Sequence, residues 1–188
     1  FGQAAFGAQT IDIRFNATQT IVSDDWLVID VAKVYGDTSA GSIWGLTQAA
    51  GLWNTLTVPL FFVDGYVDQG ATDAATLGLS WVNRNGVTVR ADFQADLTLG
   101  GAVGLAEQAA HAARAANLVA HELLHNLGLS HVGYSGTNLM NPVLELEPNG
   151  LLSFEQVATV LASPYVQTDA FGQRYISITP FAVLPTTA

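Results

Sequence analysis

Hydrophobic side chains gather in short segments whose patterns predict strands. Residues 11–15 alternate apolar and polar positions, and residues 26–34 are rich in branched and aromatic side chains, so both are predicted to be strands that pair in one sheet. A uniformly apolar run at 58–63 predicts a buried strand. Two more predicted strands, at about 76–82 and 87–93, flank an Asn-Gly dipeptide that is typical of a hairpin.

A second pattern, with apolar positions three or four residues apart, predicts helices. It covers residues 39–55, and an Ala- and Leu-rich stretch without Pro or Gly predicts a long helix over 105–127. A third helix is predicted over 151–162, with Ser153 as its N-cap. Residues 64–73 and 129–150 are predicted loops. The tail from residue 173 contains a strand-like YISIT and two prolines, and its place in the fold is not predicted.

Composition narrows the class of protein. A chain of 188 residues, 49% hydrophobic and 12% charged, fits one packed domain. The formal charge of -10 argues against nucleic acid as a partner, and the apolar runs are too short to cross a membrane. Without cysteine there is no disulfide, and a metal must be held by His and carboxylates. The acidic composition suits solubility outside the cell, and the first residue, Phe1, fits either a processed chain that has lost a signal or pro-segment or a chain that was simply trimmed. A secreted protein is expected.

The candidate chemistry lies within the long helix, in the sequence HELLH. His121 and His125 are one turn apart, so both imidazoles can reach one metal ion. Gly128 allows a sharp turn, after which His131 supplies a third nitrogen. Three His ligands leave a fourth position for water, as in catalytic zinc sites. Glu122 is then the natural general base, because zinc lowers the pKa of its water to about 7.

Two simpler interpretations compete with a catalytic site. H-E-x-x-H occurs by chance on helices, although the added Gly128 and His131 make chance a poor explanation. A structural zinc site with the same ligands is the second interpretation, against which Glu122 and the open coordination position argue. Met140, the only methionine, stands in a short loop before Pro142, where a core-filling role is the ordinary expectation.

The segment from His121 to Pro142 resembles the metzincin zinc peptidases, in which a Met-turn underlies the metal, and Met140 would occupy that turn. Residues 49–62 are similar to a segment of the matrixins, the matrix-metalloproteinase-like group. The resemblance implies an α+β fold with a mixed twisted sheet, a backing helix, an active-site helix and a C-terminal helix. Subdomains of about 1–128 and 129–188 are expected.

The same resemblance implies how a substrate would bind. An extended peptide would lie antiparallel to an edge strand at about 77–81. The expected substrate pocket comprises Leu77, Gly78, Leu79, Asn141, Pro142 and Val143. Asp64, Asp68 and Asp73 fall where matrixins often bind calcium, although an acidic solvated loop is the favoured interpretation.

Some residues depart from the matrixin pattern. The second, structural zinc of that group needs three more His, but His111 is the only other one, and a surface or packed role is favoured for it. One zinc per chain is therefore expected. Val132 replaces the Ser that usually follows the third ligand in matrixins, which suggests a bacterial branch of the group. Astacins and serralysins have a Tyr two residues after the Met of the Met-turn, and its absence after Met140 favours a matrixin-like site.

The function predicted from the sequence is zinc-dependent hydrolysis of peptide bonds in proteins by a secreted, monomeric endopeptidase. Two alternatives stay open: a non-catalytic zinc-containing binding or adhesion module, and a zinc hydrolase acting on a non-peptide amide.

Overall fold

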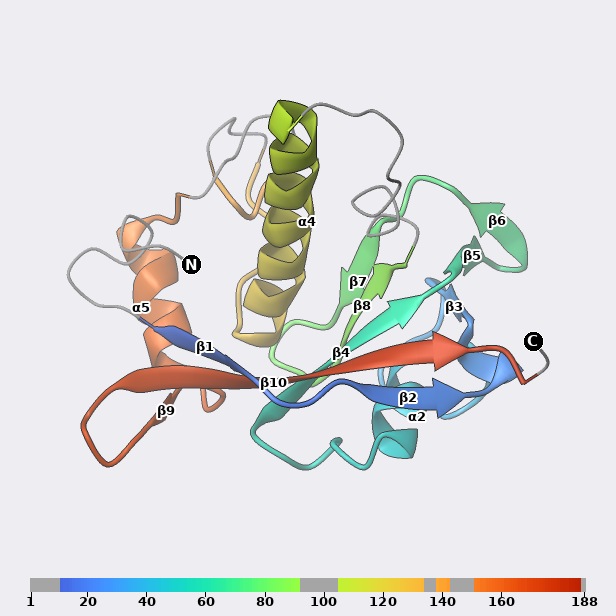
Figure 1. The fold of residues 1–188 in the computed structure, drawn as a ribbon, viewed down its shortest axis with the longest axis horizontal. Helices are drawn as coiled ribbons and strands as arrows, with labels where there is room; N and C mark the ends of the chain where they lie inside the picture. The colour runs from blue at the N-terminus through green and yellow to red at the C-terminus, as the bar shows by residue number, and fades with distance from the viewer. Residues whose placement is uncertain (1–10, 92–104, 134–137, 143–150, 187–188) are drawn as a thin grey trace.

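A computed structural model describes residues 11–91, 105–133, 138–142 and 151–186, apart from the side chains of 105–111. In this part of the chain the fold is mixed α+β, with a twisted mixed sheet and three α-helices (Figure 1). The helices are α2 (Ile43–Ala49), α4 (Leu105–Asn126) and α5 (Phe154–Ala162), and a 3-10 turn, η1, spans Asp24–Trp26. The strands are β1 (Asp12–Phe15), β2 (Gln19–Val22), β3 (Val28–Asp30), β4 (Thr57–Val63), β5 (Gly65–Asp68), β6 (Ala71–Asp73), β7 (Gly78–Ser80), β8 (Val87–Arg90), β9 (Gln167–Thr168) and β10 (Arg174–Leu184).

The main sheet has the strand order β1-β10-β4-β8-β7. Its central pairs are parallel, whereas β7 runs antiparallel to β8 and forms the last strand of this path. The two strands predicted on either side of the Asn-Gly dipeptide are thus confirmed as an antiparallel pair, β7 and β8. The predicted strand at 58–63 is β4, and it lies at the centre of the sheet.

The centre of the sheet also contains the tail, whose place the sequence pattern did not predict. Strand β10 pairs with β4 on one side and with β1 and then β2 on the other. Figure 1 shows it running the length of the sheet. Residues on both sides of the subdomain boundary expected near 128 therefore share this sheet.

Two hydrophobic clusters cover the two faces of the sheet. Because successive side chains of a strand point to opposite faces, Val58 and Leu60 of β4 join the cluster under α4 and α5, whereas Phe61 and Val63 join the cluster around α2. Being buried on both faces explains why β4 reads as a continuous apolar run.

Two predictions for the first half of the chain are wrong. Residues 26–34 do not form one strand beside β1: β3 is only three residues long and belongs to a separate sheet of β3, β5 and β6. The predicted loop at 64–73 contains a hairpin of β5 and β6, because Gln69 and Gly70, with φ of 49° and 87°, make a tight two-residue turn.

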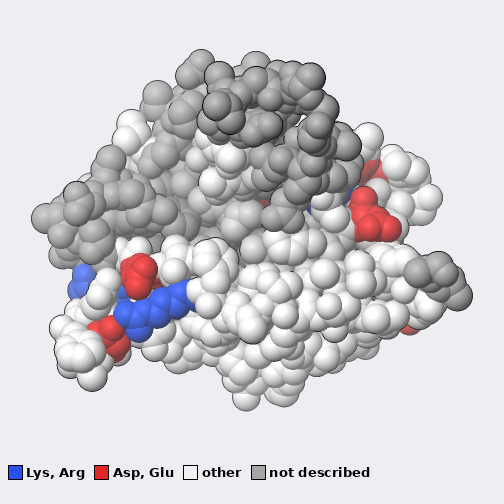
Figure 2. Space-filling view, in the orientation of Figure 1, with Lys and Arg blue, Asp and Glu red and all other residues white. Residues whose placement is uncertain are grey.

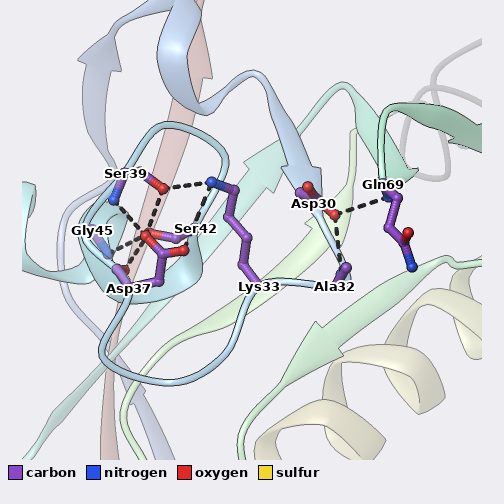
Figure 3. Close-up of polar contacts among 8 residues, drawn as sticks. All are labelled: Asp30, Ala32, Lys33, Asp37, Ser39, Ser42, Gly45 and Gln69. Atoms are coloured by element: carbon purple, nitrogen blue, oxygen red, sulfur yellow. Dashed lines mark hydrogen bonds and ion pairs between the residues drawn. The ribbon is translucent and has the colours of Figure 1, made fainter.

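Side-chain hydrogen bonds end β3 and start α2 (Figure 3). The Asp30 carboxylate accepts from the main-chain N–H groups of Ala32 and Gln69, which turns the chain away from the sheet. Ser42 then caps α2 by accepting from the Gly45 N–H group. The helix predicted over 39–55 is shorter as a result, and Gly51 with φ of 70° follows its end.

The two later helices match their predicted positions. Helix α4 packs against β7 and β8, and α5 begins with a capping box formed by Ser153 and Gln156. No helix in the described part of the chain has the length and hydrophobicity needed to span a membrane.

Charged side chains are few on the face drawn in Figure 2, where blue and red lie together at the end of the sheet near β9. There Arg14 forms ion pairs with Asp12 and Asp169. Among the described residues of this face no broad basic patch is visible.

Candidate metal centre

The last turns of α4 carry the first part of the centre. His121 and His125 lie one helical turn apart and are 8% and 7% exposed, and Glu122 between them is 6% exposed. This burial comes from the helix packing against β7 and β8 on one side and the turns after the helix on the other. Charged or ligating side chains held this deeply need a specific partner.

A glycine turn redirects the chain after α4. The N–H of Gly128 bonds to the His125 carbonyl and that of Leu129 to the Leu124 carbonyl, which is a Schellman motif. Gly128 has φ of 105°, and a Cβ atom there would stand 2.7 Å from the Asn83 Oδ1 atom. The residue must therefore be glycine for both conformational and steric reasons.

The turn around Met140 closes the centre from the other side. Met140 is fully buried, and its carbonyl accepts from the N–H of Val132, next to His131. Asn138 stabilises this turn by accepting from the Met140 N–H group at 2.9 Å. The loop that carries His131 and the loop that carries Met140 are thereby joined.

Main-chain carbonyls orient two of the three imidazoles. The Nδ1 atom of His121 lies 2.7 Å from the Leu139 carbonyl oxygen, and that of His125 lies 2.6 Å from the Leu129 carbonyl oxygen. A carbonyl oxygen only accepts hydrogen bonds, so in each ring the proton is on Nδ1 and the lone pair is on Nε2. Burial also lowers the pKa of both rings, that of His125 to about 4, and so favours the neutral form.

The three Nε2 atoms converge on one point. The Nε2 atom of His131 lies 3.1 Å from those of His121 and His125, which are 3.2 Å apart. Zinc–nitrogen bonds of 2.0–2.1 Å in tetrahedral geometry would separate the nitrogens by about 3.3 Å, close to the spacing of these three atoms. The donor set therefore fits a metal ion, and it is the only such group of three in the part of the chain described.

Glu122 points its carboxylate at the edge strand. Its Oε2 atom accepts a hydrogen bond of 2.7 Å from the Ser80 hydroxyl. Burial raises the pKa of Glu122 to about 7, and the bond from Ser80 opposes this rise. A carboxyl group with a pKa near neutral can both accept and return a proton.

An open cavity of about 720 Å³ connects these groups with the edge strand. Its wall includes all three histidines and Glu122, and five of the six residues predicted for a substrate pocket: Leu77, Gly78, Leu79, Asn141 and Pro142. The sixth, Val143, lies outside the described residues, as does the side chain of His111.

The three aspartates considered for calcium are not brought together. Asp64 and Asp68 are exposed, and Asp73 accepts hydrogen bonds from Ala75 and Thr76, which lower its pKa. Within the described residues they form no group that could share a cation. The structure therefore does not gather these three aspartates, which lie within a ten-residue segment of the sequence.

Two residues near the centre were not identified from the sequence. Ser80 bonds Glu122, and the amide of Asn126 bonds the N–H and carbonyl of Gly86 and the carbonyl of Trp81, which ties the β7–β8 hairpin to α4. Asn126 could have been noticed in the sequence, because it directly follows the second His and Asn is disfavoured inside a helix.

No known protein-family model, curated protein or solved structure matches this chain.

Metal analysis tests the histidine cluster. The chain should bind one ion, and His131→Ala should weaken zinc binding at least about 100-fold, since loss of an outer-shell partner alone typically costs 10–100-fold. Zinc retained during dialysis against a competing chelator measures this. The control, His111→Ala, should bind zinc like the wild type, and an unchanged affinity in His131→Ala would remove His131 from the site.

Glu122 also makes the stability of the metal-free chain depend on pH. Its pKa is raised from 4.5 to about 7 by folding, so its contribution to the free energy of unfolding is full below about pH 4.5 and is lost as the pH rises through 7. The free energy of unfolding of the chelator-treated wild type, measured with urea, should fall by roughly 2–3 kcal/mol more over this pH range than that of Glu122→Gln. His121 and His125, whose lowered pKa values act in the opposite direction, are common to both chains. Parallel pH profiles would contradict the prediction.

Proposed function

We propose that this chain is a zinc-dependent endopeptidase of the metzincin kind, similar to the matrixins. The observation that carries the proposal is the convergence of three imidazole nitrogens beside the buried carboxyl group of Glu122, in a cavity open to solvent. A site that only stabilised the fold would not need a general base or an open wall.

His121, His125 and His131 would hold the ion, and zinc in such a site supplies Lewis-acid polarisation of a carbonyl and acidification of water. Glu122 takes a proton from the attacking water while the oxygen bonds to the scissile carbon. It then gives that proton to the departing amine nitrogen as the C–N bond breaks. The raised pKa of Glu122 suits both transfers.

Strand β7 would bind the peptide. It is the last strand of the main sheet and lies along the cavity wall, so an extended segment can add to its outer edge by main-chain hydrogen bonds. Pro142 and Leu77 line the same cavity, which favours an apolar side chain next to the cleaved bond.

Other features of the proposal follow from the matrixin resemblance. The buried Met140 in the turn bonded to the His131 loop, the mixed sheet and helix α5 support a metzincin-type fold. A secreted monomer that acts on protein or peptide substrates is part of the same proposal. The acidic composition suits solubility outside the cell.

Glu122→Gln tests the proposed role of the carboxylate, because it keeps the size of the side chain but removes its proton exchange. Hydrolysis of a quenched fluorescent peptide by the zinc-loaded chain should fall at least about 100-fold. Bound zinc and melting temperature should stay close to wild type when zinc is present. Glu155→Gln, the same change at an exposed position on α5, is the matched control and should retain full activity.

Different failures lead to different conclusions. Full peptidase activity in folded, zinc-loaded Glu122→Gln would contradict the mechanism. A zinc-loaded wild type that cleaves no peptide in a mixed library would favour a non-catalytic binding module, and cleavage of non-peptide amides alone would favour the other alternative.

A further inference from the structure

One face of the edge strand is shaped around the Glu122 side chain. Gly78 and Ser80 are two residues apart in β7, so their side-chain positions lie on the same face of the sheet. A Cβ atom on Gly78 would stand 2.8 Å from both Cγ and Oε1 of Glu122, too close for any side chain. Ser80 places its hydroxyl 2.7 Å from Glu122 Oε2. The strand thus leaves space for the carboxyl group at one position and binds it at the next.

The Ser80 hydroxyl has two acceptors on the same residue. Its oxygen lies 2.8 Å from the main-chain carbonyl oxygen of Glu122 as well as 2.7 Å from Oε2. A hydroxyl carries one hydrogen and can also accept. It can therefore donate to an ionised Glu122, or donate to the main-chain carbonyl and accept from the protonated carboxyl group. The contact with Oε2 persists in either case.

Ser80 is the only described side chain that hydrogen-bonds the Glu122 carboxyl group. Removing a partner of a buried carboxylate leaves one oxygen unsatisfied and the side chain free to rotate. Since Ser80 also bonds the main chain of α4, its hydroxyl connects β7 directly to the turn that carries the general base.

We propose that Ser80 is a positioning residue for the hydrolysis, whose hydroxyl holds the Glu122 carboxyl group in one orientation while it accepts a proton from water and returns it to the amine. The Ser80 proton itself is not transferred to substrate. This inference rests on the proposed function. If Ser80 has this role, a residue that affects kcat lies on β7, the strand that is expected to bind the peptide.

Ser80→Ala tests the inference on the zinc-loaded chain with a quenched fluorescent peptide. The value of kcat should fall about tenfold or more, because a charged group loses its hydrogen bond, while KM and bound zinc stay the same. Ser80→Thr keeps the hydroxyl and should recover much of the lost kcat. In a Glu122→Gln background Ser80→Ala should have little further effect, since the residue acts through that carboxyl group.

A matched control separates this effect from general loss of a hydroxyl. Ser177→Ala removes a hydroxyl from β10 of the same sheet, outside the cavity wall, and should leave kcat unchanged. If the wild type is active and Ser80→Ala is equally active, this inference alone is overturned. The same holds if Ser80→Ala lowers kcat by the same factor in the wild type and in the Glu122→Gln background. A zinc-loaded wild type without peptidase activity would instead overturn the proposed function and this inference with it.

Discussion

His121 and His125 each donate the Nδ1 proton to a main-chain carbonyl, and the organisation of the centre depends on these two hydrogen bonds. They set which nitrogen is free to bind a metal and which way each ring faces. The two carbonyls, of Leu139 and Leu129, are supplied by turns outside the helix. The Schellman turn at Gly128 and the turn at Met140 therefore determine the geometry of ligands that precede them in the chain.

The β7–β8 hairpin is tied to the same helix by a second group of hydrogen bonds. Ser80 bonds Glu122, the Asn83 N–H bonds the His125 carbonyl, and the Asn126 amide bonds Gly86 and Trp81. As a result several hydrogen bonds join the strand expected to bind substrate to the helix that carries two of the histidines and Glu122. Preorganisation of this kind is what catalytic geometry requires.

Local patterns predicted the parts of this site that are close in sequence. The spacing of His121 and His125 follows from the helical repeat, and the Asn-Gly turn predicted the pairing of β7 with β8. Ser80 could not be identified in this way, because its contact with Glu122 joins residues 42 positions apart.

The larger omissions in the fold also have physical reasons. Pro180 lies within β10 opposite Leu60, although a proline argues against a central strand, so the tail's pattern concealed its place in the sheet. The polar composition of 64–73 indicated a loop, yet the turn at Gln69 and Gly70 lets short strands pair there. In both cases tertiary pairing outweighed local preference.

Cleavage-site profiling is the most direct test of whether the three histidines and Glu122 form a peptidase centre. A mixed peptide library would be incubated with the zinc-loaded chain and with the same preparation after zinc removal, and the products identified by mass spectrometry. We predict cleavage only with zinc, at internal bonds followed by apolar residues, and its recovery when zinc is restored. Cleavage that continues after the metal is removed, or no cleavage by a folded chain with one bound zinc, would contradict this function.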